Sequence, residues 1–114
     1  MSRRHFIEGM PKVALVLRND IQGVTKTSAA KDIMAVMGDM DDVIKADESN
    51  KIWVGKDKMR NRCCVSCCGL LVVYASNNGM DCAFRNLLGF ELCNISCLDL
   101  LQLAHGGHLS PLCV

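Results

Sequence analysis

The chain has 114 residues, half of them hydrophobic, and a formal net charge of only +1. This length allows one domain, or part of one, with a modest core, and the hydrophobic content excludes disorder throughout. The longest apolar runs, residues 13–17 and 70–75, are far shorter than the roughly 20 residues that span a membrane. Pro11 and Lys12 interrupt the basic start before a signal-peptide core can form. We therefore expect a cytoplasmic protein, with no membrane contact, whose eight cysteines are not paired in disulfides.

The first half of the chain predicts one short strand followed by two helices. Residues 13–17 are continuously apolar, and turn residues end this buried-strand candidate quickly. From 27 to 37 the apolar residues recur at helical spacing, and Gly38 is placed to end this helix. Asp39 is expected to cap a second helix, whose first turn is acidic. The apolar face of that second helix is predicted to contain Met40, Val43 and Ile44.

A long apolar run follows the central part of the chain. Residues 70–75 are continuously apolar, which is typical of a parallel strand covered on both faces. Gly79 then opens a predicted helix that ends at Gly89. The apolar residues of this helix that follow helical spacing are Met80, Ala83, Phe84, Leu87 and Leu88.

The end of the chain continues this alternation of strands and helices. Residues 90–95 are a predicted strand, and Ser96 with Asp99 resembles the capping box of a short helix. A last apolar segment covers residues 109–114. The pattern predicts an α/β protein with a small, mostly parallel sheet and flanking helices. No repeat or linker divides it, so we expect a single, incomplete domain over residues 1–114.

The stretch 51–69 carries the most information about function. It contains five Lys or Arg residues and one carboxylate, whereas residues 19–50 contain three cations and seven acids. A loop of this composition, with Gly55 for backbone freedom, is typical of phosphate contacts, although a solvated charged surface has the same pattern. The candidate RNA-binding residues are Lys51, Lys56, Lys58, Arg60, Asn61 and Arg62.

Four cysteines follow directly, and they define the alternative function. They are Cys63, Cys64, Cys67 and Cys68. Cys64 and Cys67 have the spacing of a zinc knuckle, but a closed site needs a second pair of ligands, and none lies at a familiar spacing. A thioredoxin-like role is weaker, because the dithiol precedes a strand and not a helix. The alternative is thus a small zinc- or thiol-based binding protein.

The chain contains no pattern that predicts catalysis. It has no phosphate-binding P-loop, nucleophile elbow or paired carboxylates in a plausible cleft. His105 and His108 lie in a Gly-rich turn without a third ligand. We therefore expect no enzyme, no cofactor and no small-molecule substrate.

A series of short segments has a characteristic order and spacing. These segments are 55–62, 71–74, 77–79, 83–86, 92–96, 100–104 and 106–108. Their order resembles the large-subunit ribosomal protein L-four family in its archaeal and eukaryotic form, over about residues 45–114. The resemblance implies a structural constituent of the large ribosomal subunit that binds ribosomal RNA and touches neighbouring large-subunit proteins.

The resemblance also implies a truncated and divergent copy. Nothing in this chain corresponds to the family's long tunnel loop, and Asp57 stands at a glycine position. Positions where the family is usually basic are occupied here by Cys63, Cys64, Cys67, Cys68, Cys82, Cys97 and Trp53. The loss of those positive charges accounts for the near-neutral net charge of this chain. Truncation leads us to expect that one face of the strand at 70–75 is uncovered and that the isolated chain is marginally folded.

Overall fold

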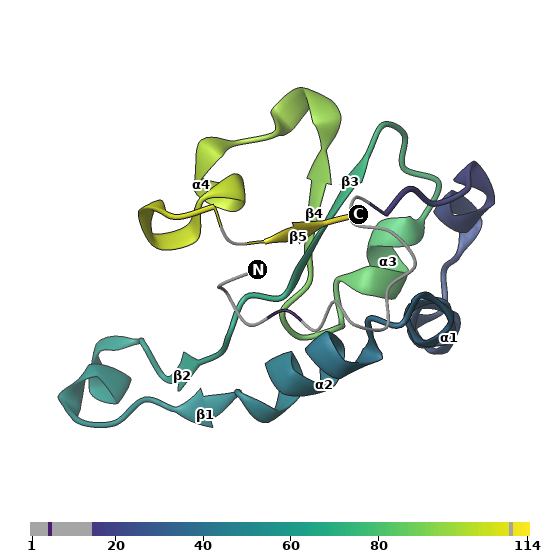
Figure 1. The fold of residues 1–114 in the computed structure, drawn as a ribbon. Helices are drawn as coiled ribbons and strands as arrows, with labels where there is room; N and C mark the ends of the chain where they lie inside the picture. The colour runs from purple at the N-terminus through teal and green to yellow at the C-terminus, as the bar shows by residue number, and fades with distance from the viewer. Residues whose placement is uncertain (1–4, 6–14, 110) are drawn as a thin grey trace.

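We describe a computed structural model, in which residues 5, 15–109 and 111–114 are described (Figure 1). The helices are α1 Thr27–Met37, α2 Met40–Glu48, α3 Met80–Phe84 and α4 Leu100–Leu103. The strands are β1 Lys51–Ile52, β2 Cys64–Val65, β3 Leu70–Tyr74, β4 Glu91–Asn94 and β5 Leu112–Cys113. Short 3-10 helices are η1 Asn19–Gly23, η2 Lys56–Arg60, η3 Ile95–Cys97 and η4 His105–Gly107.

The main sheet has three strands in the order β4-β3-β5, and both neighbours run parallel to the central strand β3. Leu71 lies opposite Glu91 on one side and Cys113 on the other. The chain passes through α3 between β3 and β4, and through α4 between β4 and β5. Strands β1 and β2 form a separate antiparallel pair. The predicted α/β class, with a small, mostly parallel sheet and flanking helices, is confirmed.

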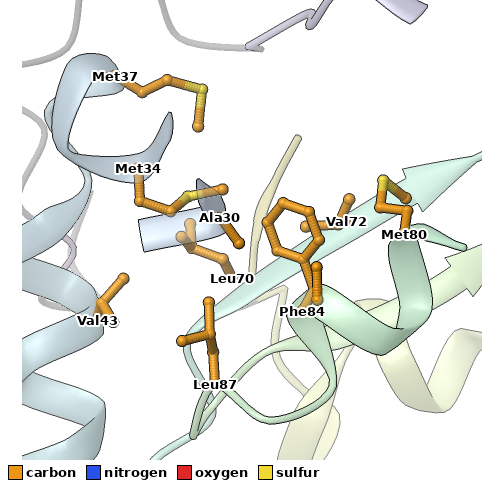
Figure 2. Packing of buried hydrophobic residues seen from close by; sticks show 10 residues of the cluster. Ala30, Met34, Met37, Val43, Leu70, Val72, Met80, Phe84 and Leu87 are labelled. Carbon is orange, nitrogen blue, oxygen red and sulfur yellow. The ribbon is translucent and has the colours of Figure 1, made fainter. Parts of the chain in front are cut away.

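The hydrophobic core lies between β3 and the helices α1, α2 and α3 (Figure 2). Phe84 of α3 and Met34 of α1 are completely buried. Leu70 and Val72 belong to the same cluster, because residues two apart in a strand point to the same face. Leu71, between them, is also buried. The start of β3 is therefore covered on both faces, and the expectation of one uncovered face is wrong for Leu70, Leu71 and Val72.

The first predicted helix is confirmed, and the second is confirmed with corrections. Gly38 ends α1 in the left-handed conformation, with φ 86°. Asp39, however, makes no capping hydrogen bond with its side chain and is only 1% exposed. The predicted face of α2 is also displaced, because Ile44 is 44% exposed while Asp42 is buried. Helical spacing did not determine which face of α2 is buried, and packing against α1 determines it.

The third predicted helix is shorter than expected. Its buried face is as predicted up to Leu87, but α3 ends at Phe84 and Leu88 is exposed. The chain turns at Gly89, which has φ 81°, and passes close to α2. A Cβ atom at Gly89 would lie 2.6 Å from the Cβ atom of Ala46. Glycine is therefore required here both for its backbone conformation and for the close packing.

Two further local predictions need correction. The capping box of α4 is formed by Asp99 and Gln102, whose Oε1 accepts a hydrogen bond from the backbone of Asp99 at 3.4 Å. Ser96 instead bonds the side chain of Asn94. Residues 15–17 are not a strand, and residues 13 and 14 of that prediction lie outside the described residues. Within the described part of the chain, no helix is long and apolar enough to cross a membrane.

Candidate nucleic-acid interface

The candidate RNA-binding stretch folds as an antiparallel hairpin that projects away from the sheet and helices (Figure 1). We call residues 51–65 the basic hairpin. Lys51 pairs with Val65 at its base, and the N–H of Trp53 donates a hydrogen bond of 2.8 Å to the carbonyl of Cys63. The 3-10 helix η2 forms its tip. The loop predicted at this position is therefore an ordered projection.

Two residues with unusual backbone conformations shape the tip. Gly55 has φ 95° and ψ −159°, a region that is essentially restricted to glycine. Asn61 ends η2 with φ 63° and is the one residue other than glycine with a positive φ in the described chain. Asparagine tolerates this left-handed conformation better than most residues. The predicted need for backbone freedom at Gly55 is confirmed, and Asn61 has a structural role that the sequence analysis missed.

The exposed cations at the tip point in different directions around the axis of η2. Lys56, Lys58 and Arg60 all lie in η2 and are exposed. Because a 3-10 helix has about three residues per turn, positions two apart point about 120° away from each other. The three cations therefore point in three different directions and do not form a single flat face. The remaining predicted contact residues, Lys51, Asn61 and Arg62, are exposed as well.

One cation of the hairpin already has an acidic partner. The guanidinium of Arg62 lies 2.6 Å from the carboxylate of Asp57, and the N–H of Arg62 donates to the backbone carbonyl of Asp57 at 3.3 Å. The ion pair partly neutralises Arg62. The sequence did not predict this contact between Asp57 and Arg62, because it depends on how the tip folds back.

The base of the hairpin is held by the body of the protein. Ser49, next to the end of α2, accepts a hydrogen bond of 2.8 Å from the N–H of Cys67 and donates one of 2.7 Å to the carbonyl of Ala46. The N–H of Gly69 donates to the carbonyl of Gly89 at 2.8 Å. Cys67 and Gly69, which donate these hydrogen bonds, both follow β2 in the chain. The hairpin therefore has a fixed base and an exposed tip.

Apolar side chains at the tip were not part of the predicted site. Val54 and Met59 are almost fully exposed, and Trp53 is partly exposed. Exposed aromatic rings next to cations are common in proteins that stack on unpaired RNA bases. Trp53 is the single tryptophan in the chain, and this signal could have added it to the candidate residues.

The cysteine cluster does not form the predicted alternative site. Cys63, Cys64, Cys67 and Cys68 are all exposed free thiols. Among the described residues, the group whose potential metal ligands meet is instead Cys68 with Glu91 and His105. Cys68 is exposed but partly desolvated, and this partial burial, the nearby carboxylate of Glu91 and the neighbouring Cys67 raise its pKa. A raised pKa is the opposite of what an activated thiolate requires. The alternative binding function based on these four cysteines therefore lacks support.

The chain matches no protein-family model. It is, however, similar along its length to curated proteins named "Large ribosomal subunit protein uL4". The protein of Urechis caupo is 37% identical over 114 residues, which cover 100% of this chain and 30% of the relative. The protein of Prunus armeniaca is 42% identical over 110 residues, which cover 96% of this chain and 27% of the relative.

The uL4 protein of Trypanosoma brucei brucei is 40% identical over 109 residues, which cover 96% of this chain and 29% of the relative. The chain thus spans about three tenths of the length of the curated relatives it matches. Identities of 37 to 42% over nearly all of this chain make these proteins its homologues, and the chain is similar to a segment of each of them.

Proposed function

We propose that this chain is a structural constituent of the large ribosomal subunit that binds ribosomal RNA through the basic hairpin. Homologues with the name of a large-subunit protein support the cellular context. The observation that carries the assignment to the hairpin is its exposed tip, where Lys56, Lys58 and Arg60 project from a base fixed to the body. The proposal includes no enzymatic activity, and it places the chain in the ribosome beside RNA and neighbouring proteins.

The shape of the tip favours one kind of RNA contact. Cations that point in three directions cannot all meet one flat phosphate surface, but they can meet phosphates on several sides of a narrow RNA cleft. In this arrangement Lys56, Lys58 and Arg60 neutralise phosphates, and the amide of Asn61 hydrogen-bonds to sugar or base atoms. Trp53 is available to stack on an unpaired base. Phosphate contacts of this kind fix position and contribute little sequence preference.

The test compares two variants with the same change in charge. The hairpin variant replaces Lys56, Lys58 and Arg60 by glutamine. The control variant replaces three exposed cations of the body by glutamine, namely Lys26, Lys31 and Arg85. Binding to a fragment of large-subunit ribosomal RNA is measured over a series of salt concentrations. We expect the hairpin variant to lose about 0.7 to 0.9 from the slope of log affinity against log salt for each lost phosphate contact, and the control to keep most of the slope.

A second measurement addresses the ribosome itself. The unaltered chain should co-sediment with isolated large ribosomal subunits at physiological salt, and the hairpin variant should do so much less. Equal losses in the hairpin and control variants would mean that overall charge binds RNA and that the hairpin is not the site. No co-sedimentation of the unaltered chain would contradict the assignment to the large subunit.

A further inference from the structure

Three side chains that are far apart in sequence meet at the base of the basic hairpin. The ligand atoms of Cys68, Glu91 and His105 all lie within 4.8 Å of one another. The Nε2 atom of His105 is 3.5 Å from a carboxylate oxygen of Glu91. In a tetrahedral zinc site, neighbouring ligand atoms are about 3.3 to 3.8 Å apart, from metal–ligand distances near 2.0 to 2.3 Å. Small side-chain rotations would therefore bring the three atoms around one metal ion.

The backbone holds two of these residues in neighbouring positions. Glu91 begins β4, where it lies opposite Leu71 of β3. Cys68 lies shortly before β3, and the adjacent Gly69 is tied to Gly89 by a backbone hydrogen bond of 2.8 Å. The two parallel strands begin next to each other and thus place the thiol and the carboxylate side by side.

The third residue arrives from the crossover between β4 and β5. His105 begins η4, directly after α4. The capping box at the start of α4 and the hydrogen bond from Gly107 to the carbonyl of Ala104, 3.1 Å long, order this segment. The imidazole is partly buried, at 27% exposure. The cluster therefore joins three separate segments of the fold.

The donor set has a chemical preference. A thiolate sulfur, an imidazole nitrogen and a carboxylate oxygen are the three ligand types that zinc accepts, whereas calcium and magnesium prefer oxygen ligands alone. We propose that Cys68, Glu91 and His105 form a zinc site in which water completes a tetrahedral shell. This set differs from the four neighbouring cysteines, because only Cys68 belongs to both. Binding releases the proton of the Cys68 thiol, since the thiolate is the ligand.

The consequence for the molecule is a cross-link at the base of the basic hairpin. A bound ion would tie the segment after β2 to β4 and to η4. The site is independent of the RNA proposal, because it uses none of the proposed RNA-binding residues. It can be tested without RNA.

The test uses the full chain, reduced and freed of metal, with cobalt(II) as a spectroscopic substitute for zinc. We expect one equivalent of Co²⁺ to bind, with a thiolate-to-cobalt charge-transfer band and the visible bands of a four-coordinate ion. Zn²⁺ should displace it and raise the melting temperature. Cys68→Ser should abolish the charge-transfer band. Glu91→Gln and His105→Ala should each weaken binding by roughly tenfold or more, because even residues behind the ligands have effects of this size.

Two neighbouring residues provide matched controls. Cys67→Ser removes the adjacent thiol, and His108→Ala removes the other histidine of the same turn, so both variants should bind cobalt as the unaltered chain does. The absence of a thiolate band in the unaltered chain would overturn the proposal. So would a band that survives Cys68→Ser but is lost with Cys67→Ser. Circular dichroism checks that each variant folds, and Cys68→Ala replaces Cys68→Ser if the serine variant does not.

Discussion

At the scale of single residues, Asp39 shows a conflict between local and tertiary requirements. Its position before α2 suits a capping carboxylate, but the carboxylate is buried and neither oxygen has a hydrogen-bond partner among the described groups. Burial, reinforced by the nearby Asp42, raises the pKa of Asp39 to about 6, although His5 acts in the opposite direction. Asp42 itself lies 2.6 Å from the ring of His5. An ionised Asp39 is therefore a destabilising element at neutral pH.

This conflict predicts how stability depends on pH. The pKa of Asp39 in the folded chain lies above its ordinary value of 3.8. Its protonated form therefore contributes fully to folding stability below pH 3.8, and this contribution is lost as the pH rises through about 6. In Asp39→Asn this loss is absent. The stability of Asp39→Asn relative to the unaltered chain should increase by roughly 2 kcal/mol between pH 4 and pH 7, because each pKa unit corresponds to about 1.4 kcal/mol. Urea unfolding at a series of pH values measures the difference.

Asp41 provides the control for this experiment. It lies in the first turn of α2, like Asp42, but its side chain is exposed. Asp41→Asn changes the same charge on the same helix without altering a buried group. A similar dependence on pH in both variants would attribute the effect to the net charge of α2 and not to the burial of Asp39.

At the scale of elements, the basic hairpin depends on a few contacts. Its strands β1 and β2 pair over only two residues each, and so short a ladder is barely stable by itself. Ser49 and Gly69 fix its base, while Gly55 and Asn61 allow its turns. The Asp57–Arg62 ion pair at the tip restricts Arg62 and reduces the positive charge available to RNA.

Removing this ion pair should increase the affinity for RNA. Asp57→Ala frees Arg62 and removes one negative charge from the tip. We expect tighter binding to ribosomal RNA and a slope of log affinity against log salt that is steeper by about 0.7 to 0.9, equivalent to one phosphate contact. Stability should change by no more than about 1 kcal/mol, because exposed ion pairs contribute little. Fluorescence anisotropy over a salt series measures the slope.

An equivalent ion pair elsewhere serves as the control. Arg18 and Asp20 lie 2.8 Å apart and are both exposed on the body of the protein. Asp20→Ala changes the net charge by the same amount and also frees an arginine. If Asp20→Ala strengthens binding as much as Asp57→Ala does, the location of the charge is unimportant and the hairpin is not the RNA site.

At the scale of the whole molecule, the body leaves large apolar side chains in contact with solvent. Leu100 and Leu101 of α4 are 72% and 75% exposed, and Leu109 is 83% exposed. Val16 and Val36 are also almost fully exposed. Exposed apolar surface of this kind favours association when it is continuous. The expected marginal stability of the isolated chain remains a prediction.

Charges on α4 should reduce association. The double variant Leu100→Lys, Leu101→Lys removes two exposed apolar side chains, and lysine is about as favourable in a helix as leucine. We expect the unaltered chain to form oligomers at micromolar concentration and the variant to shift towards the monomer, as measured by analytical ultracentrifugation. The control adds the same charge at exposed polar positions, with Ser28→Lys and Asn86→Lys. An equal shift in the control would assign the effect to net charge alone.

The sequence by itself determined the features that depend on neighbouring residues. The spacing of apolar residues and Gly38 predicted α1, a continuous apolar run predicted β3, and a predicted strand at 90–95 and a last apolar segment at 109–114 contain β4 and β5. The charge pattern predicted a basic loop at 51–69, and its cation-rich part, residues 56–62, has too few apolar residues to enter a core.

Tertiary structure alone decided which residues that are distant in sequence come together. Asp39 is buried because α1 and α2 pack on β3. The residues next to Asp39 in the sequence do not predict this packing. Cys68 meets Glu91 and His105 because two parallel strands start side by side and a crossover returns to them. The spacing of cysteines suggested other partners, since spacing reports separation along the chain and not distance in space. Strand register and helix packing set that distance, and both result from burial of the whole core.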